Sequence, residues 1–297
     1  MGKRVLCIIV TYNAMQWIDR CLNSLFKSDY PVDVFIADNG STDDTIVHVK
    51  ELFPTCHLIC NVKNVGFGKA NNLGLLYALQ NNYDYAYLLN QDAWIFPDTV
   101  SKLIEIHSRY IEFGILSPFQ MEANMERIDE NFLKGVCSWT ANKDLFNDYY
   151  NQTIQEIYSV PDVMAAHWLI SRECLMKVGL FSPSFPHYGE DNNYAERVLY
   201  HNYKIGIVPA VRVVHDRENR IATKDKLIYL EYIRNIRILS SLNTQSCRFR
   251  KVFYNTFKAL IKYRSIKTLQ YFFLLIINLK KILFNRKATM REGAFLS

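Results

Sequence analysis

The chain has 297 residues, of which 49% are hydrophobic and 22% are charged, which is an ordinary composition for a globular protein. Its 11 Gly and 8 Pro exclude collagen-like and low-complexity chains, and its 19 Tyr and 18 Phe exclude a disordered chain. The net charge of +6 is unevenly distributed, because residues 217–297 carry +14 and residues 1–216 carry −8. A basic C-terminal part joined to an acidic body indicates a polyanionic partner.

Over the first 110 residues, apolar runs alternate with helical patterns. A strand buried on both faces is expected at residues 4–10, and further strands at residues 32–37, 58–60 and 85–89. Helices are expected around residues 17–25, from a cap at Ser41 or Thr42 through Leu52, over residues 67–79, and from Pro97 to about Tyr110. Strands that alternate with helices predict an α/β fold with a mostly parallel sheet.

Beyond residue 110 the pattern is looser. A helix is expected over residues 169–178, another from Glu190, and short strands at residues 204–208 and 211–214. From residue 224 onward the chain is expected to be helical. The predicted organisation is therefore an α/β domain of residues 1–216 and a basic amphipathic helical region of residues 217–297.

Cysteine usage and targeting signals suggest the cytoplasm. The seven cysteines contain no Cys-x-x-Cys pair and form no zinc set, and the first apolar run has no cleavage site of a signal peptide. The longest uncharged stretch in the C-terminal region, residues 268–279, is shorter than the roughly 20 residues of a spanning helix. We expect reduced thiols and no membrane crossing.

Polar clusters follow three of the predicted strands. They are Thr11-Tyr12-Asn13, Asp38-Asn39 and Asn90-Gln91-Asp92. Each alone is typical of turn chemistry. Because the carboxyl ends of parallel strands share one edge of a sheet, where ligands bind, the three together predict a site.

Six motifs occur in an order that resembles the inverting glycosyltransferases of family 2, which have the nucleotide-sugar-binding GT-A fold. The motifs are Ile8-Ile9-Val10-Thr11-Tyr12-Asn13, Ala37-Asp38-Asn39-Gly40-Ser41-Thr42-Asp43-Asp44, Asn64-Val65-Gly66-Phe67-Gly68-Lys69-Ala70-Asn71-Asn72, Leu88-Leu89-Asn90-Gln91-Asp92, Tyr188-Gly189-Glu190-Asp191 and Val213-Val214-His215. The Asn-x-Gly-Phe and Asn-x-Asp variants look like the rhamnosyltransferase-like branch that builds bacterial surface polysaccharides. The resemblance implies transfer of a hexosyl or deoxyhexosyl group from a nucleoside-diphosphate sugar to a glycan acceptor.

The resemblance also implies a donor site at the strand ends. Its expected contacts are Thr11, Tyr12, Asn13, Asp38, Asn39, Asn64, Gly66, Phe67, Lys69 and Asn90. Asp38 can accept the N3–H of uracil or thymine, which favours UDP or dTDP. Two glycines before a helix fit close approach of the backbone to a nucleotide, and Lys69 either faces a phosphate or is solvated.

A divalent metal, Mn²⁺ or Mg²⁺, is expected to neutralise the leaving diphosphate. Asp92 is the expected carboxylate ligand, and His215 the second ligand or else a structural loop residue. Asn90 stands where the family has an Asp, and it can bind a ribose hydroxyl but cannot neutralise charge. Asp191 is the expected general base, kept ionised by the helix dipole, and Glu190 is expected to orient its neighbours.

The acceptor and the partners are predicted less directly. His167 and Trp168 lie where relatives bind acceptor, and a Trp face can stack on a sugar, although core packing also explains it. The basic region is expected to bind an anionic membrane surface at the inner face of the cell membrane, near a lipid-linked acceptor. Packing on the body and homodimer formation are alternatives, and no nucleic-acid recognition motif is present.

Two other functions fit parts of the sequence. A sugar nucleotidylyltransferase also begins with a parallel α/β sheet, but it is expected to have a Gly-rich first loop where Thr11-Tyr12-Asn13 stands. A degenerate scaffold that binds nucleotide sugar without transfer is suggested by Asn90 and Asn193, and opposed by Asp92 and Asp191.

Overall fold

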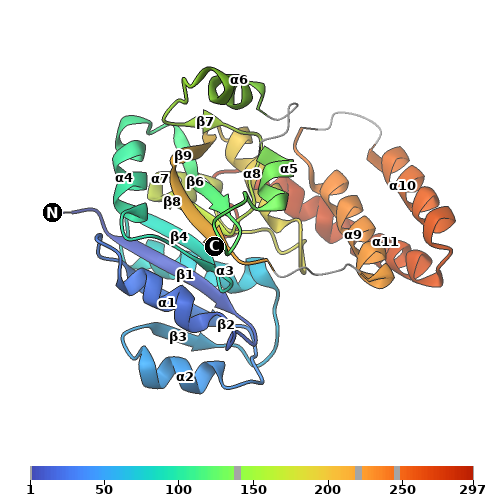
Figure 1. Cartoon of the computed structure of the whole chain (residues 1–297). Helices are drawn as coiled ribbons and strands as arrows, with labels where there is room; N and C mark the ends of the chain where they lie inside the picture. Colours follow the sequence, from blue (N-terminus) through green and yellow to red (C-terminus); the bar gives the residue numbers. More distant parts are fainter. Residues whose placement is uncertain (1, 137–141, 218–222, 244–247, 297) are drawn as a thin grey trace.

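The chain folds around one nine-stranded mixed sheet with helices on both faces, followed by three helices that extend to one side (Figure 1). The computed structural model describes residues 2–136, 142–217, 223–243 and 248–296. The strand order is β3-β2-β1-β4-β8-β6-β9-β5, and β7 pairs with β9 outside this path. The predicted α/β fold with a helical C-terminal region is confirmed.

Four parallel strands form the N-terminal half of the sheet. They are β1 (Val5–Thr11), β2 (Asp33–Asp38), β3 (His57–Cys60) and β4 (Tyr85–Asn90). Val10 in β1 lies opposite both Ala37 and Asn90, so three strands end almost level. The apolar runs of β1, β2 and β4 are buried, as expected where helices cover both faces of a parallel sheet.

The other half of the sheet is mixed. Its strands are β5 (Ala93–Trp94), β6 (Phe113–Met121), β7 (Tyr158–Ser159), β8 (His167–Ser171) and β9 (Lys204–His215). β8 is antiparallel to β4 and β6, whereas β6 and β9 are parallel. The two short strands predicted at residues 204–208 and 211–214 are one strand, with an irregular register opposite Pro118 and Phe119.

The helix predicted over residues 169–178 is wrong at its first three residues. Residues 167–171 form β8, and the helix α7 spans only Arg172–Val178. Ser171 begins this helix, and its hydroxyl accepts a hydrogen bond from the Cys174 N–H at 3.3 Å. A short apolar run such as residues 168–170 fits a buried strand as well as a helix, so periodicity alone does not distinguish them.

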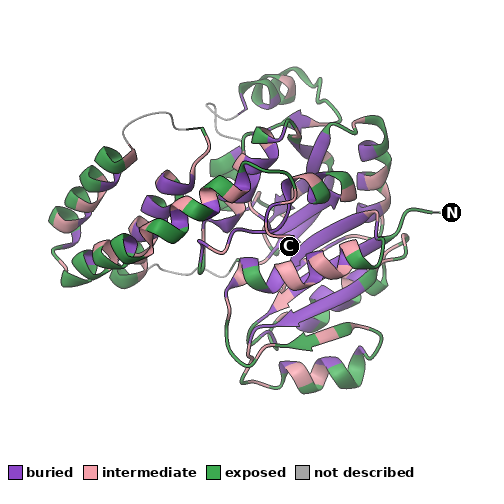
Figure 2. Cartoon of the chain, turned by 180° about the vertical axis from the view of Figure 1, so that it is seen from behind, coloured by how far each residue is buried: buried purple, intermediate pink, exposed green. Residues whose placement is uncertain are grey.

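Helices cover both faces of the sheet. They are α1 (Ile18–Phe26), α2 (Thr45–Leu52), α3 (Phe67–Gln80), α4 (Thr99–Arg109), α5 (Glu130–Val136), α6 (Lys143–Asn151) and α8 (Glu190–Tyr200). One core packs Leu22 and Leu103 against the sheet, and the other packs Leu75 and Val198 against its opposite face. Figure 2 shows the strands between them as buried.

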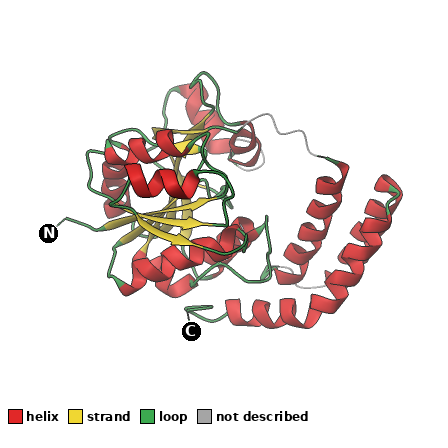
Figure 3. Ribbon diagram, turned by 90° about the horizontal axis from the view of Figure 1, so that it is seen from below, coloured by secondary structure: helices red, strands yellow, loops and turns green. Residues whose placement is uncertain are grey.

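The C-terminal region consists of three helices that pack on one another and on the body. They are α9 (Lys224–Ser240), α10 (Arg248–Tyr263) and α11 (Ile266–Thr289). Phe185 of the body shares a core with Ile236 and Leu275, and the chain returns to the body where the Leu180 N–H donates to the Ala294 carbonyl at 2.9 Å. Figure 3 shows these helices beside the body. Among the described residues, no helix is both long and apolar enough to span a membrane.

Candidate active site

A cleft of about 640 Å³ lies at the edge of the sheet where β4 and β9 end. Six residues predicted from the sequence line it, namely Phe67, Asn90, Asp92, Glu190, Asp191 and His215. They come from four separate motifs. The fold therefore brings together, in one cavity, the residues expected to bind metal and to act as the base.

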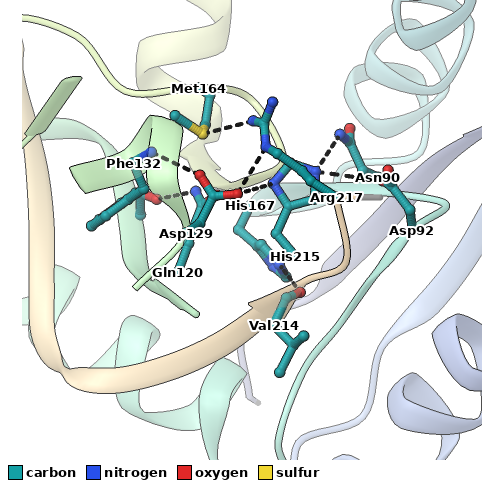
Figure 4. Close-up of polar contacts among 11 residues, drawn as sticks. Asn90, Asp92, Gln120, Asp129, Phe132, Met164, His167, Val214, His215 and Arg217 are labelled. Atoms are coloured by element: carbon teal, nitrogen blue, oxygen red, sulfur yellow. Dashed lines mark hydrogen bonds and ion pairs between the residues drawn. The ribbon is translucent and has the colours of Figure 1, made fainter. Parts of the chain in front are cut away.

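Asp92 and His215 are adjacent because β5 and β9 pair. Ala93 lies opposite His215, and the Asp216 N–H donates to the Asp92 carbonyl at 2.8 Å. The His215 Nε2 atom is 3.5 Å from Asp92 Oδ1 and 3.4 Å from Asn90 Nδ2 (Figure 4). The His215 side chain is only 3% exposed and that of Asp92 13%. The imidazole therefore forms the buried floor of the cleft beside one carboxylate.

Asp129 and Arg217 complete this cluster and were not predicted. The Arg217 Nε atom donates to Asp129 Oδ2 at 2.9 Å, and the same oxygen is 3.9 Å from His215 Nδ1 (Figure 4). The only local signal for Asp129 is an acidic residue just before an apolar helix, which predicts an N-cap. Its proximity to His215 depends on β6 and β9 and has no local sequence signature.

Glu190 and Asp191 begin α8 and line the cleft. Tyr188 and Gly189 precede them with φ of +68° and +78°, a left-handed turn that starts the helix at Glu190, as predicted. Burial, followed by the charge of Asp191, raises the pKa of Glu190 from 4.5 to about 8. One oxygen of Glu190, Oε2, has no hydrogen-bond partner in the described part of the chain.

The environment of Asp191 favours the protonated, neutral carboxyl group more than the helix dipole alone suggests. Burial raises its pKa above the ordinary 3.8, against the lowering effects of the Asn192 N–H, which donates at 2.8 Å, and of the Arg237 charge. A carboxylate whose pKa is raised toward neutrality is a stronger proton acceptor.

The predicted nucleotide motifs are connected by hydrogen bonds outside the cleft lining. The Thr11 hydroxyl donates to Asp38 Oδ2 at 2.9 Å, and the Gly40 and Ser41 N–H groups donate to Asp38 Oδ1. Thr11 and Asp38 are fully buried, whereas Tyr12 is 47% exposed. Asp38 therefore holds the turn, and contact with a nucleobase would require the Ser41 hydroxyl to leave Asp38 Oδ2.

Ser41 does not cap α2, because its hydroxyl accepts from the Asn13 N–H at 2.9 Å as well as bonding Asp38. The helix begins later, at Thr45, so the predicted cap at Ser41 or Thr42 is wrong. The side chain of Asn13 in turn accepts from the Thr42 N–H at 2.8 Å. The first two motifs thus form one hydrogen-bonded edge.

The third motif joins this edge through two asparagines. Asn39 Nδ2 donates to Asn64 Oδ1 at 3.1 Å, which also accepts from the Gly66 N–H. The glycine expected to approach a nucleotide instead approaches protein, since a Cβ on Gly66 would lie 2.0 Å from the Pro186 carbonyl oxygen. Lys69 is exposed on α3 and does not line the cleft.

The predicted acceptor contacts of His167 and Trp168 are wrong. Both side chains are fully buried in β8. Trp168 stacks on Phe181 with centroids 6.3 Å apart, inside the core. His167 uses both ring nitrogens, on the Tyr87 hydroxyl and the Val214 carbonyl, each at 2.9 Å, and burial lowers its pKa to about 3. Neither residue reaches the cleft.

The side chains at the cleft floor fit a divalent cation that is coordinated partly by the protein and partly by a bound phosphate group. No group of three or more His, Cys, Asp or Glu side chains is arranged around a metal position within the described ranges. Asp92 and His215 supply one oxygen and one nitrogen 3.5 Å apart, close to the roughly 3 Å between neighbouring ligands of one ion. Two protein ligands suit a metal whose other positions are taken by phosphates and water.

Of the five cysteines in the described residues, none forms a disulfide. They are Cys7, Cys21, Cys56, Cys60 and Cys174. Cys137 and Cys247 lie outside the described residues. Burial raises the pKa of the Cys56 thiol to about 11, which keeps it protonated. The expectation of reduced thiols therefore stands for the described part only.

Solved structures share this architecture at low sequence identity. A mannosyltransferase, PcManGT from Pyrobaculum calidifontis in complex with GDP-Man and Mn²⁺, aligns with a TM-score of 0.56 over 98% of this chain and 85% of its own, at 16% identity. TarS of S. aureus in complex with UDP-GlcNAc aligns with a TM-score of 0.57 over 97% of this chain and 84% of its own, at 14% identity. The fold is thus that of the GT-A glycosyltransferases.

Sequence comparison then gives the family. The family model for glycosyl transferase family 2 matches residues 6–179, and the chain belongs to that family. An N-acetylglucosaminyl-diphospho-decaprenol L-rhamnosyltransferase of Mycobacterium tuberculosis is 25% identical over 235 residues, which cover 71% of this chain and 75% of the relative. The dTDP-rhamnosyl transferase RfbF of Shigella flexneri is 22% identical over 220 residues, covering 72% and 70%. The chain is a rhamnosyltransferase-like glycosyltransferase, so neither the nucleotidylyltransferase nor the scaffold alternative is retained.

Proposed function

We propose that the chain is an inverting glycosyltransferase that moves a hexosyl or deoxyhexosyl group from a UDP- or dTDP-sugar to a lipid-linked glycan in surface polysaccharide synthesis. The observation that carries this proposal is the cleft, where Asp92, His215 and Asp191 line one cavity although they are far apart in sequence. The names of the two rhamnosyltransferase relatives support the donor and acceptor classes.

Asp191 acts as the general base in this proposal. Its carboxylate takes the proton of the acceptor hydroxyl as that oxygen bonds to the anomeric carbon and the bond to the diphosphate breaks. The raised pKa of Asp191 suits this task. Glu190, with a pKa of about 8, stays protonated at neutral pH and can donate a hydrogen bond to a sugar hydroxyl through its unpartnered side.

Asp92 and His215 lie at the end of the cleft that binds the diphosphate of the sugar donor. A divalent cation bound there, Mn²⁺ or Mg²⁺, offsets the charge that develops on the leaving diphosphate. The edge formed by Tyr12 and Asn13 receives the nucleobase, which Asp38 contacts once the Ser41 hydroxyl leaves Asp38 Oδ2, and Asn90 binds the ribose. Lys226, which lines the cleft from α9, adds a positive charge at its rim.

The test of this function is transfer itself. The full chain is incubated with a panel of UDP- and dTDP-sugars and a synthetic lipid diphosphate carrying N-acetylglucosamine, and the product is analysed for anomeric configuration. The proposal predicts one preferred donor and an inverted linkage. A retained configuration would overturn the inverting mechanism, and the absence of transfer from every UDP- and dTDP-sugar would overturn the donor class.

The chain also acts at an anionic membrane surface in this proposal. Residues 232–291 contain 14 Lys and Arg and no Asp or Glu. On α10, four apolar side chains at every fourth position are 52–62% exposed and form what we call the α10 stripe, namely Phe249, Phe253, Phe257 and Ile261. Figure 2 shows much of α10 and α11 exposed. An exposed apolar stripe on a helix that itself contains no Asp or Glu is complementary to an anionic bilayer.

Basic residues adjoin the stripe. Arg250, Lys258 and Lys262 each follow a stripe residue and are exposed. At about 1 kcal/mol per basic residue near such a surface, reversing two lysines should weaken adsorption at least about 100-fold. Such binding would place the chain on the inner face of the cell membrane, in the cytoplasm, close to its acceptor.

Vesicle binding tests this surface without removing the C-terminal helices, whose loss would expose the core shared with the body. Lys258→Glu with Lys262→Glu should abolish sedimentation with phosphatidylglycerol vesicles. Lys27→Glu with Lys50→Glu, exposed on the body, makes the same charge change and should not. Equal effects of the two pairs, or a full chain that ignores vesicles and dimerises through α10, would overturn the membrane proposal.

A further inference from the structure

Asp129 is a buried carboxylate beside the cleft with no part in the reaction proposed above. Its side chain is 2% exposed. It lies just before α5, where Oδ1 accepts a hydrogen bond from the Phe132 N–H at 2.7 Å. Its other oxygen, Oδ2, is directed toward Arg217 and His215 (Figure 4). Burying a carboxylate is costly unless it is paired, so this second oxygen requires donors.

The imidazole of His215 lies between two carboxylates. Its Nε2 atom is 3.5 Å from Asp92 Oδ1, and its Nδ1 atom is 3.9 Å from Asp129 Oδ2. Nδ1 is buried and has no hydrogen-bond partner in the part of the chain that is described. An unprotonated Nδ1 would direct its lone pair at a negative oxygen, whereas a protonated Nδ1 is attracted to it.

The two ring nitrogens differ in their other neighbour: the Asn90 amide Nδ2 lies 3.4 Å from Nε2 and can only donate, so it requires a lone pair on Nε2, whereas Asp129 Oδ2 faces Nδ1 and can only accept. These two contacts place the imidazole proton on Nδ1. A neutral imidazole carries one proton, so a proton on Nδ1 facing Asp129 leaves the lone pair of Nε2 directed at the cleft and Asp92. Only an unprotonated nitrogen can bind a cation. The tautomer that Asp129 favours is therefore the one in which His215 can serve as a metal ligand.

Arg217 holds Asp129 in this orientation. Its Nε atom donates to Asp129 Oδ2 at 2.9 Å, and its Nη2 atom is 2.9 Å from Met164 Sδ. The guanidinium neutralises Asp129, so this carboxylate does not compete with Asp92 for the cation. We propose that Asp129, held by Arg217, is a positioning residue that sets the tautomer of His215 for cation binding. This inference rests on the metal role proposed for His215.

The first measurement is the tautomer of His215 in the metal-free full chain, by ¹⁵N NMR at a pH where imidazole is neutral, with His215→Gln to assign the signal. Asp129→Asn keeps an oxygen for the Phe132 N–H, so α5 remains capped, and directs an amide N–H at Nδ1. The proton is expected on Nδ1 in the natural chain and on Nε2 in the variant. An unchanged tautomer would overturn the proposal.

The second measurement is Mn²⁺ affinity in the presence of UDP, by electron paramagnetic resonance. Loss of a carboxylate behind a ligating His costs about 10–100-fold in metal affinity, and Asp129→Asn should show such a loss. Glu130→Gln is the matched control, because Glu130 also lines the cleft and carries the same charge but is paired with Lys134. An equal loss of Mn²⁺ affinity in both variants would mean that Asp129 acts only through its charge, and it would overturn the positioning role.

Two further measurements distinguish failure of the tautomer proposal from misfolding of the variant and from failure of the metal role. If Asp129→Asn does not fold, Asp129→Ser, which also preserves a helix cap, should show a mixture of the two tautomers. A pure Nδ1–H signal in Asp129→Ser would overturn the proposal. If the natural chain binds no Mn²⁺, the proposed metal role fails, and the NMR measurement alone decides whether Asp129 orients His215.

Discussion

Replacing Glu190 with Gln should make the folded chain more stable at alkaline pH and leave its stability unchanged in acid. Glu190 is 5% exposed, and its pKa is raised from 4.5 to about 8, mainly by burial and next by the charge of Asp191. Between these two values the folded chain holds one proton more than the unfolded chain. Its stability therefore falls as pH rises through the interval, and a Gln side chain avoids this loss.

The size of the effect follows from the same shift. Each pH unit within the interval costs about 1.4 kcal/mol, so the loss from pH 4.5 to pH 8 approaches about 5 kcal/mol. Urea unfolding measures it directly. The free energies of unfolding of the natural chain and Glu190→Gln should agree near about pH 4 and differ by several kcal/mol near about pH 9.

The control for this prediction is a carboxylate that folding leaves in water. Glu51 is exposed on α2, and Glu51→Gln should change the free energy of unfolding by less than about 0.5 kcal/mol at every pH. A difference between the natural chain and Glu190→Gln that is the same at every pH would refute the reasoning. It would mean that Glu190 ionises in the fold as it does in water.

Two other predictions concern the chemistry. Asp191→Asn keeps an acceptor for the Asn192 N–H but cannot take a proton, so turnover should fall at least about 100-fold while donor affinity, measured by calorimetry, stays near normal. Near-normal turnover would move the role of base to Glu190. Asp92→Ala should weaken Mn²⁺-dependent binding of UDP more than binding of uridine, and His215→Ala should do so more mildly, because the cation contacts phosphates and not the base. Transfer that survives a chelator would refute the metal role of both residues.

The N-terminal half of the fold was predictable because the apolar runs of its sequence coincide with the strands of its structure. The apolar runs of β1, β2 and β4 are strands buried on both faces, and each ends in a polar cluster, whereas β3 is a mostly exposed edge strand. The level ends of β1, β2 and β4 then bring those clusters together. In a parallel sheet every strand points the same way, so residues that directly follow a strand can be predicted from the sequence to lie at one edge of the sheet.

The mixed half was less predictable for two physical reasons. β8 and α7 follow one another without a connecting loop, and the Ser171 cap marks the boundary between them. The pattern of β6 is broken by Ser117, Pro118 and Gln120, which lie buried in a bulged pairing with β9. Because Trp168 lies in that half, a ring expected at the acceptor is instead in the core.

The contacts of α9 make the C-terminal region part of the catalytic unit. The Tyr229 hydroxyl donates to the His187 carbonyl at 3.2 Å, and a Cβ on Gly189 would lie 2.8 Å from Ile233 Cγ2. The turn that starts α8, and so positions Glu190 and Asp191, is thus packed directly on α9. The same helix packs against α10, which carries the exposed stripe proposed to bind membrane. In the membrane-bound state proposed above, a helix that contacts both would hold the cleft at a constant distance from the bilayer and so from a lipid-linked acceptor.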